Sequence, residues 1–197
     1  MHQPNFEAAK QYIFTKLENG LPEDLIYHGM HHTCDDVLPA AERLAARAQV
    51  QGEALLLLRT GALYHDVGYL EQYANNEPVG ARIAEETLPD FGYNQSQIDV
   101  IKAIILATQM PQAPHTLLEA LMCDADLDSL GREDFLETSL NLRAELAMHG
   151  LSIPLQAWYE KQLEFLTSHQ YFTEAACALR NAGKERNIAL LERLLNR

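Results

Sequence analysis

The sequence has few cysteines, and they do not cluster. Cys34, Cys123 and Cys177 are odd in number and far apart, which fits neither a disulfide framework nor a structural zinc site. A reducing compartment, and so a cytoplasmic location, is expected. No run reaches the roughly 18 consecutive apolar residues that a membrane helix needs. Residues 1–14 lack the basic and apolar regions of an export signal, so neither export nor membrane insertion is expected.

Basic residues are also scarce. The 197 residues include 15 Lys and Arg against 28 Asp and Glu, for a formal net charge of −13. A surface of this sign repels nucleic-acid backbones and anionic lipids. Nucleic-acid and membrane partners are therefore not expected, whereas a local pocket for one small phosphorylated molecule remains compatible with the composition.

Strand patterns are missing, and helical periodicity recurs along nearly the whole chain. The expected fold class is therefore all-α, with residues 1–197 forming a single domain, since 47% hydrophobic residues suffice for one sizeable core. Helices are expected at residues 4–18, 33–51, 53–67, 79–88, 95–109, 114–130, 133–149, 154–168 and 172–195, the last of them open to a break near Gly183.

Two expected helices carry polar residues on their apolar faces. Within 53–67, Leu55, Leu58, Ala62 and His65 fall on one stripe, which predicts that His65 is buried. Within 95–109 the apolar stripe continues to Thr108, so a small hydroxyl should face the core. His32 stands at the start of the helix expected over 33–51.

Four segments combine imidazole, carboxylate and amide groups. They are Tyr27-His28-Gly29-Met30-His31-His32-Thr33, His65-Asp66-Val67-Gly68-Tyr69, Asn75-Asn76-Glu77 and Cys123-Asp124-Ala125-Asp126-Leu127-Asp128. Imidazole together with carboxylate suits a first-row divalent ion better than an all-oxygen calcium cage. Adjacent His65 and Asp66 differ by roughly 100° around a helix. They could bind one ion at a helix end, which Gly68 offers.

The His-Asp pair alone is a weak motif, because roughly 0.4 such pairs arise by chance at this composition. Its setting is more specific: an aromatic, His-rich segment precedes it, an apolar helix leads into it, and an acidic cluster follows. In that order, residues 27–131 resemble the HD-domain superfamily of metal-dependent phosphohydrolases. The resemblance implies a helical HD-domain bundle over this core, with additional N- and C-terminal helices.

The resemblance also implies a ligand set. His32 matches the first metal ligand, His65 and Asp66 match the central pair, and Ala125-Asp126 matches the last ligand, with Asp124 as the alternative. His28 matches a position near the leaving group in some members. The implied cofactor is one divalent ion from among Mn, Mg, Fe, Co, Ni and Zn.

The sequence departs from the binuclear members of that superfamily. Where these add histidines, this chain has Asn76-Glu77 and Thr108-Gln109, and neither Thr nor Gln is a strong ligand for first-row metals. A single-metal site is therefore expected. Glu77 is the candidate for activating water or supporting the ligands.

The expected reaction is attack of metal-activated water on a nucleotide or another small phosphomonoester or phosphodiester. Asp66 holds the ion, and His28 is a candidate proton donor to the leaving oxygen. Arg143, Arg180 and Lys184 are candidate substrate-binding residues, as is Lys102. The alternatives are a catalytically degenerate HD module that binds metal or ligand for regulation, and a helical scaffold without metal.

Overall fold

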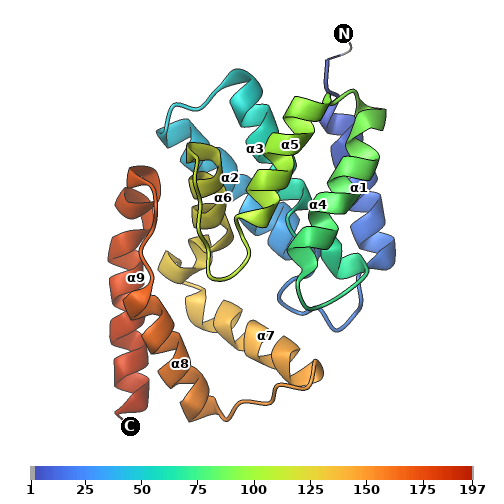
Figure 1. Ribbon diagram of the computed structural model, residues 1–197. Helices are drawn as coiled ribbons and strands as arrows, with labels where there is room; N and C mark the ends of the chain where they lie inside the picture. Colours follow the sequence, from blue (N-terminus) through green and yellow to red (C-terminus); the bar gives the residue numbers. More distant parts are fainter. Residues whose placement is uncertain (1–2, 197) are drawn as a thin grey trace.

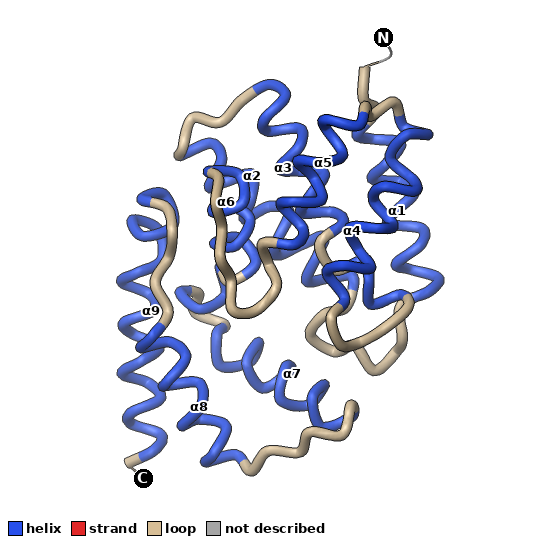
Figure 2. Tube along the Cα trace, in the orientation of Figure 1, coloured by secondary structure: helices blue, strands red, loops and turns tan. Residues whose placement is uncertain are grey.

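The computed structural model describes residues 3–196, and all regular secondary structure in this range is helical (Figures 1 and 2). This confirms the predicted fold class. No helix in the described range is both long and apolar enough to cross a membrane. The α-helices are α1 (Phe6–Gly20), α2 (Leu38–Arg47), α3 (Gly52–Tyr64), α4 (Asn76–Thr87), α5 (Gln95–Leu106), α6 (Leu117–Asp126), α7 (Phe135–Met148), α8 (Leu155–Ser168) and α9 (Glu174–Leu195).

The core lies among α1 to α6. Leu58 and Ala62 of α3 and Ile101 and Ile105 of α5 are fully buried, and each pair has the four-residue spacing of a helix face. Helix α3 packs against α1, α2, α5 and α6. Because α3 is surrounded in this way, its C-terminal end, where the His-Asp pair follows, is held firmly inside the molecule.

The predicted helices are interrupted in three places that later matter. His32–Val37 forms a π-helical turn before α2, with the amide of Leu38 donating to the carbonyl of Thr33. Pro39 follows, and since proline has no amide proton it cannot donate an α-helical hydrogen bond there. The expected 53–67 helix ends at Tyr64, and the expected 114–130 helix divides into α6 and a short 3-10 turn, Asp128–Gly131.

Helices α7, α8 and α9 form a second group along one side of the bundle (gold to red in Figure 1). Helix α9 packs on α8 and on the Asp128–Gly131 turn. At this crossing a Cβ added to Gly183 would lie 1.9 Å from the carbonyl oxygen of Gly131. The break near Gly183 was thus a wrong prediction: α9 is continuous, and the missing side chain permits close backbone packing.

Gly183→Ala is expected to lower the free energy of unfolding by roughly 2–4 kcal/mol, because the new methyl group overlaps backbone that cannot move independently. Denaturant unfolding measures the change. The matched control is Asn181→Ala, an exposed position on the same helix, expected to stay within about 0.5 kcal/mol of the parent. Equal stability of the two variants would contradict the tight crossing.

Candidate metal centre

The His-Asp pair lies where α3 ends and the chain turns toward α4. The Nδ1–H of His65 donates to the carbonyl of Ala62 at 2.9 Å, which leaves Nε2 as the atom available to a metal. The turn is tight: a Cβ on Gly68 would lie 1.9 Å from the carbonyl oxygen of Asn76. Because Gly68 has no side chain, the start of α4 can pack against the segment that follows the His-Asp pair. The helix end that the sequence predicted near Gly68 is present, since α3 ends at Tyr64.

Four side chains from three separate segments converge at this point. Nε2 of His65 lies 3.1 Å from Oδ2 of Asp66 and 3.5 Å from Oδ1 of Asp126. Nε2 of His32, at the start of the π-helical turn, lies 3.6 Å and 3.3 Å from the same two oxygens. The structure therefore brings together the four residues of the favoured ligand set.

The geometry of these atoms fits a single divalent ion. Ligand bonds of about 2.1 Å place neighbouring donor atoms about 3.0 Å apart in an octahedron and about 3.4 Å apart in a tetrahedron. The ligand atoms of His32, His65 and Asp66 lie within 4.8 Å of one another. Nε2 of His65 and Oδ2 of Asp66 are buried without a hydrogen-bond partner. Such groups are costly to bury, so the site is built for a further binding partner.

The two carboxylates of the cluster, Asp66 and Asp126, also favour a positive charge between them. Burial alone would lower the pKa of His65, but the nearby charges of Asp66 and Asp126 raise it well above its ordinary value. Burial would raise the pKa of Asp66, yet His65 holds it below its ordinary value. The pKa of Asp126 is likewise lowered, because its contacts with His32 and His65 outweigh burial. A divalent cation bound among these side chains would supply the positive charge that protonated His65 provides without it.

The alternative ligand Asp124 is not brought to the cluster. Its carboxylate accepts the amides of Phe172 and Thr173 at 2.8 and 2.9 Å, and the hydroxyl of Thr173 at 2.6 Å. Asp124 thus fastens the N-terminal end of α9. As a ligand choice it is corrected in favour of Asp126, because two residues correspond to roughly 200° around α6 and so direct the two carboxylates to different partners.

These two aspartates can be separated experimentally. Asp126→Asn is expected to weaken manganese binding at least about tenfold, because the amide is a poor metal ligand. Asp124→Asn is expected to keep metal affinity and to lose about 1–2 kcal/mol of stability, because it disturbs the α9 cap. Metal titration and thermal unfolding of both variants test the pair; weakened binding in Asp124→Asn alone would reverse the assignment.

Asn76 and Glu77 take different positions beside the cluster. The amide of Asn76 donates to Oδ1 of Asp66 at 3.2 Å, so it orients that ligand. From the sequence, Asn76 was noted only as standing where binuclear members have a histidine. Glu77 lines the pocket next to the cluster, and one of its oxygens is buried without a partner. Burial raises the pKa of Glu77. Thr108 also lines this pocket, but its hydroxyl donates to the carbonyl of Ile105 at 2.8 Å.

His28 is held by a residue that sequence reasoning did not assign. Glu145 of α7, fully buried, lies 2.5 Å from Nδ1 of His28 and accepts the amides of Tyr27 and His28 at 2.7 and 2.9 Å. The hydroxyl of Tyr73 is its fourth donor, at 3.1 Å. The sequence did offer one signal: Glu145 follows Leu142 by three residues and precedes Leu146, so it lies on the same helix face as these two leucines.

The protonation of this pair follows from its surroundings. Burial alone would lower the pKa of His28, but the hydrogen bond with Glu145 raises it above its ordinary value. Burial would raise the pKa of Glu145, but His28 holds it below its ordinary value. His28 lines the same pocket as Asp66 and Asp126, so the pair can hold a proton next to the cluster.

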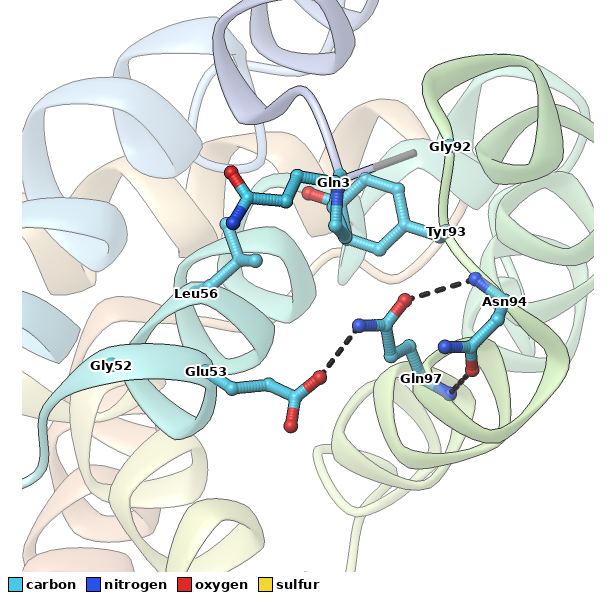
Figure 3. Close-up of a pocket in the computed structure, with 9 residues that line it drawn as sticks. Gln3, Gly52, Glu53, Leu56, Gly92, Tyr93, Asn94 and Gln97 are labelled. Carbon is cyan, nitrogen blue, oxygen red and sulfur yellow. Dashed lines mark hydrogen bonds between the residues drawn. The ribbon is translucent and has the colours of Figure 1, made fainter. Parts of the chain in front are cut away.

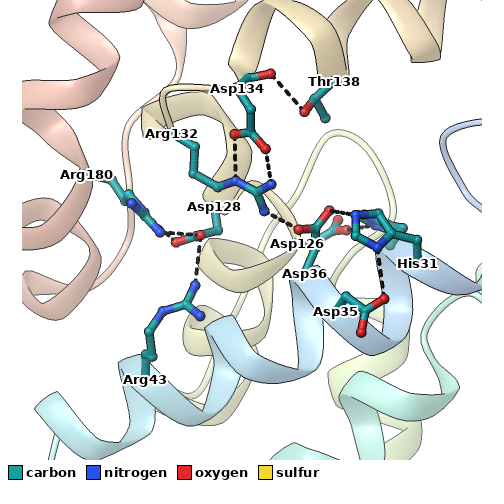
Figure 4. A network of polar contacts seen from close by, with 11 residues as sticks. His31, Asp35, Asp36, Arg43, Asp126, Asp128, Arg132, Asp134, Thr138 and Arg180 are labelled. Atoms are coloured by element: carbon teal, nitrogen blue, oxygen red, sulfur yellow. Dashed lines mark hydrogen bonds and ion pairs between the residues drawn. The ribbon is translucent and has the colours of Figure 1, made fainter.

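The three basic residues predicted to bind substrate lie elsewhere. Arg180 contacts Asp128 with two nitrogens, at 2.7 and 2.6 Å, and Arg43 approaches the same carboxylate (Figure 4). Arg143 donates to the carbonyl of Ile153 at 2.8 Å, and Lys184 donates to the carbonyl of His169. That prediction is corrected: these residues join the C-terminal helices to one another and to the bundle. Lys102 pairs with Glu85 at 2.7 Å.

A larger cavity of about 670 Å³ lies by the N-terminal ends of α3 and α5 (Figure 3). Its polar side chains bond to one another: Gln97 donates to Glu53 at 2.6 Å and accepts the amide of Asn94 at 2.9 Å. Asn94 in turn caps α5. These groups are already satisfied by a helix cap, so the smaller pocket beside the His-Asp pair is the better candidate.

A known protein family matches the part of the chain that contains most of this cluster. Residues 34–130 match the family model of the HD domain, a span that contains His65, Asp66 and Asp126 and begins just after His32. No curated protein and no solved structure matches the chain. The order of the segments, the helical core around them and the family match together identify residues 34–130 of this chain as an HD domain.

Proposed function

We propose that this protein is a metal-dependent phosphohydrolase that cleaves a small phosphomonoester or phosphodiester. The observation that carries the proposal is the convergence of His32, His65, Asp66 and Asp126 at one point. This point borders a pocket of about 350 Å³ that also contains His28 and Glu77. Ligands for one ion and two further titratable groups thus face the same small space.

The four convergent residues would hold a divalent ion, chosen from Mn, Mg, Fe, Co, Ni and Zn. When bound, such an ion withdraws charge from a phosphoryl group and lowers the pKa of water. Asn76 keeps the Asp66 carboxylate in position through its hydrogen bond. The Nδ1–H of His65 is fixed on the carbonyl of Ala62, so its ring cannot turn away.

His28 and Glu77 supply the proton transfers. His28 donates a proton from Nε2 to the leaving oxygen, while Glu145 holds the other ring nitrogen protonated and fixes the ring's direction. Glu77 has a buried, unpartnered oxygen facing the ligands' pocket. It is placed to accept a proton from attacking water.

The experiment is hydrolysis of p-nitrophenyl phosphate and bis(p-nitrophenyl) phosphate, with the metal content of the same sample measured. We expect about one ion per chain, activity that disappears with a chelator, and recovery on adding manganese. Less than about a tenth of an equivalent of ion after loading with each of the six metals would overturn the proposal.

The second candidate is a degenerate HD module that binds metal or ligand for regulation. It is favoured by one observation: no Lys or Arg lines the pocket within the described chain, whereas phosphoryl-transfer sites commonly use such residues. A full equivalent of bound ion without hydrolysis of either ester, with any of the six metals, would select this candidate.

A further inference from the structure

The pocket beside the metal cluster combines ionisable and apolar side chains. Of the ligands, Asp66 and Asp126 line it, as do His28 and Glu77. The apolar side chains that line it are Leu127, Leu142, Leu146, Phe165 and Met110. Leu142 and Leu146 come from α7, and Phe165 comes from α8. These two helices lie beyond the matched HD segment, residues 34–130. The C-terminal helices therefore add Leu142, Leu146 and Phe165 to this lining, and these three residues form an apolar wall outside the HD segment.

The charges in this pocket restrict what can enter. Asp66, Asp126 and Glu77 line it, and no lysine or arginine does so within residues 3–196. Arg143, which follows the pocket residue Leu142 on α7, donates to the carbonyl of Ile153. One bound divalent ion offsets two carboxylates, so a second or third phosphate would meet no free positive charge. The pocket suits a single phosphoryl group.

The apolar wall restricts the rest of the molecule. An anionic or strongly polar group against Leu142, Leu146 and Phe165 would lose water without gaining a hydrogen bond. An apolar group gains from the same burial. A pocket of about 350 Å³ is at the small end of ligand sites, roughly 300–1,000 Å³. A group of the size of one ring fits beside a phosphoryl group.

We propose that the substrate is an ester of one phosphoryl group with an uncharged, ring-bearing organic group that rests on Leu142, Leu146 and Phe165. This inference rests on the proposed function, because it assumes that the phosphoryl group is held at the cluster. It excludes nucleoside polyphosphates and sugar bisphosphates as preferred substrates. Helices α7 and α8 determine the specificity, while the HD core holds the ion.

Binding of phosphonates that cannot be hydrolysed tests the inference apart from turnover. The manganese-loaded protein is titrated calorimetrically with phenylphosphonate, methylphosphonate and 4-carboxyphenylphosphonate. We expect phenylphosphonate to bind at least about tenfold more tightly than methylphosphonate, because only the ring reaches the apolar wall. The added carboxylate should cost at least about tenfold, because it meets the same wall.

Substitutions in the apolar wall test whether the preference for phenylphosphonate comes from these residues. Leu146→Asn should weaken phenylphosphonate at least about threefold and leave methylphosphonate unchanged. Its control is Leu151→Asn, at an exposed leucine between α7 and α8 that does not line the pocket. If Leu146→Asn fails to fold, Phe165→Leu gives the same comparison with an apolar replacement. Equal loss for both phosphonates in the folded variant would overturn the inference.

The outcomes separate the two proposals. If methylphosphonate or the carboxylate derivative binds as tightly as phenylphosphonate, the substrate class is wrong and the hydrolase proposal stands. If none of the three phosphonates binds to protein that carries a full equivalent of manganese, phosphoryl recognition itself is absent. Both proposals are then overturned.

Discussion

Asp66→Ala is expected to remove the bound ion and to lower kcat/KM for phosphoester hydrolysis about a thousandfold or more. Oδ2 of Asp66 is buried without a hydrogen-bond partner and lies 3.1 Å from Nε2 of His65 and 3.6 Å from Nε2 of His32. Asp124 cannot replace it, because its carboxylate accepts the amides of Phe172 and Thr173. Elemental analysis and steady-state kinetics measure the two effects.

The matched control for that variant is Asp90→Ala, at an exposed carboxylate in the turn after α4. It should keep the ion and the activity of the parent protein. Thermal unfolding with and without manganese adds a second readout: the ion should raise the melting temperature of the parent and of Asp90→Ala, but not that of Asp66→Ala. Asp66→Ala protein that still carries a full equivalent of ion would show that the cluster is not the metal centre.

Glu145→Gln is expected to lower kcat/KM about a hundredfold for an alkyl phosphate, with the metal content unchanged. The amide can still accept the backbone hydrogen bonds of Tyr27 and His28, but it carries no charge to keep His28 protonated. A nitrophenolate leaves without a proton, so hydrolysis of p-nitrophenyl phosphate should fall only about threefold. This difference between leaving groups distinguishes proton donation from a general structural defect.

Tyr73→Phe is the matched control for the glutamate variant. It removes one donor to Glu145, at 3.1 Å, without changing the contact between Glu145 and His28. We expect less than about a threefold change with either leaving group. Equal losses with alkyl and nitrophenyl esters in Glu145→Gln would mean that Glu145 acts on the fold and not through His28.

The sequence was sufficient for the parts of the site that depend on local pattern. The helical spacing of Leu58, Ala62 and His65 predicted a buried imidazole, and His65 is 1% exposed. Gly68 predicted the helix end that the pair needs, and α3 ends at Tyr64. The resemblance to the HD superfamily, now supported by the family match, contributed the order of the ligands.

Other parts depend on contacts between distant segments. Glu145 is separated from His28 by more than a hundred residues, and only the packing of α7 brings them together. The basic residues were expected at the substrate because of their charge, yet Arg180 reaches Asp128 across the turn where Gly131 meets Gly183. Sequence periodicity gives the face of a helix, but it does not give the partner that the face meets.

The contact between Glu145 and His28 means that the segment that carries the candidate ligands does not contain every residue of the site. A chain shortened after Gly131 would keep His32, His65, Asp66 and Asp126, but it would lose both the carboxylate that orients His28 and the leucines of α7. If the proposed function holds, helices α7 and α8 would set the acidity of His28 and the selectivity of the pocket, while the bundle of α1 to α6 would hold the ion.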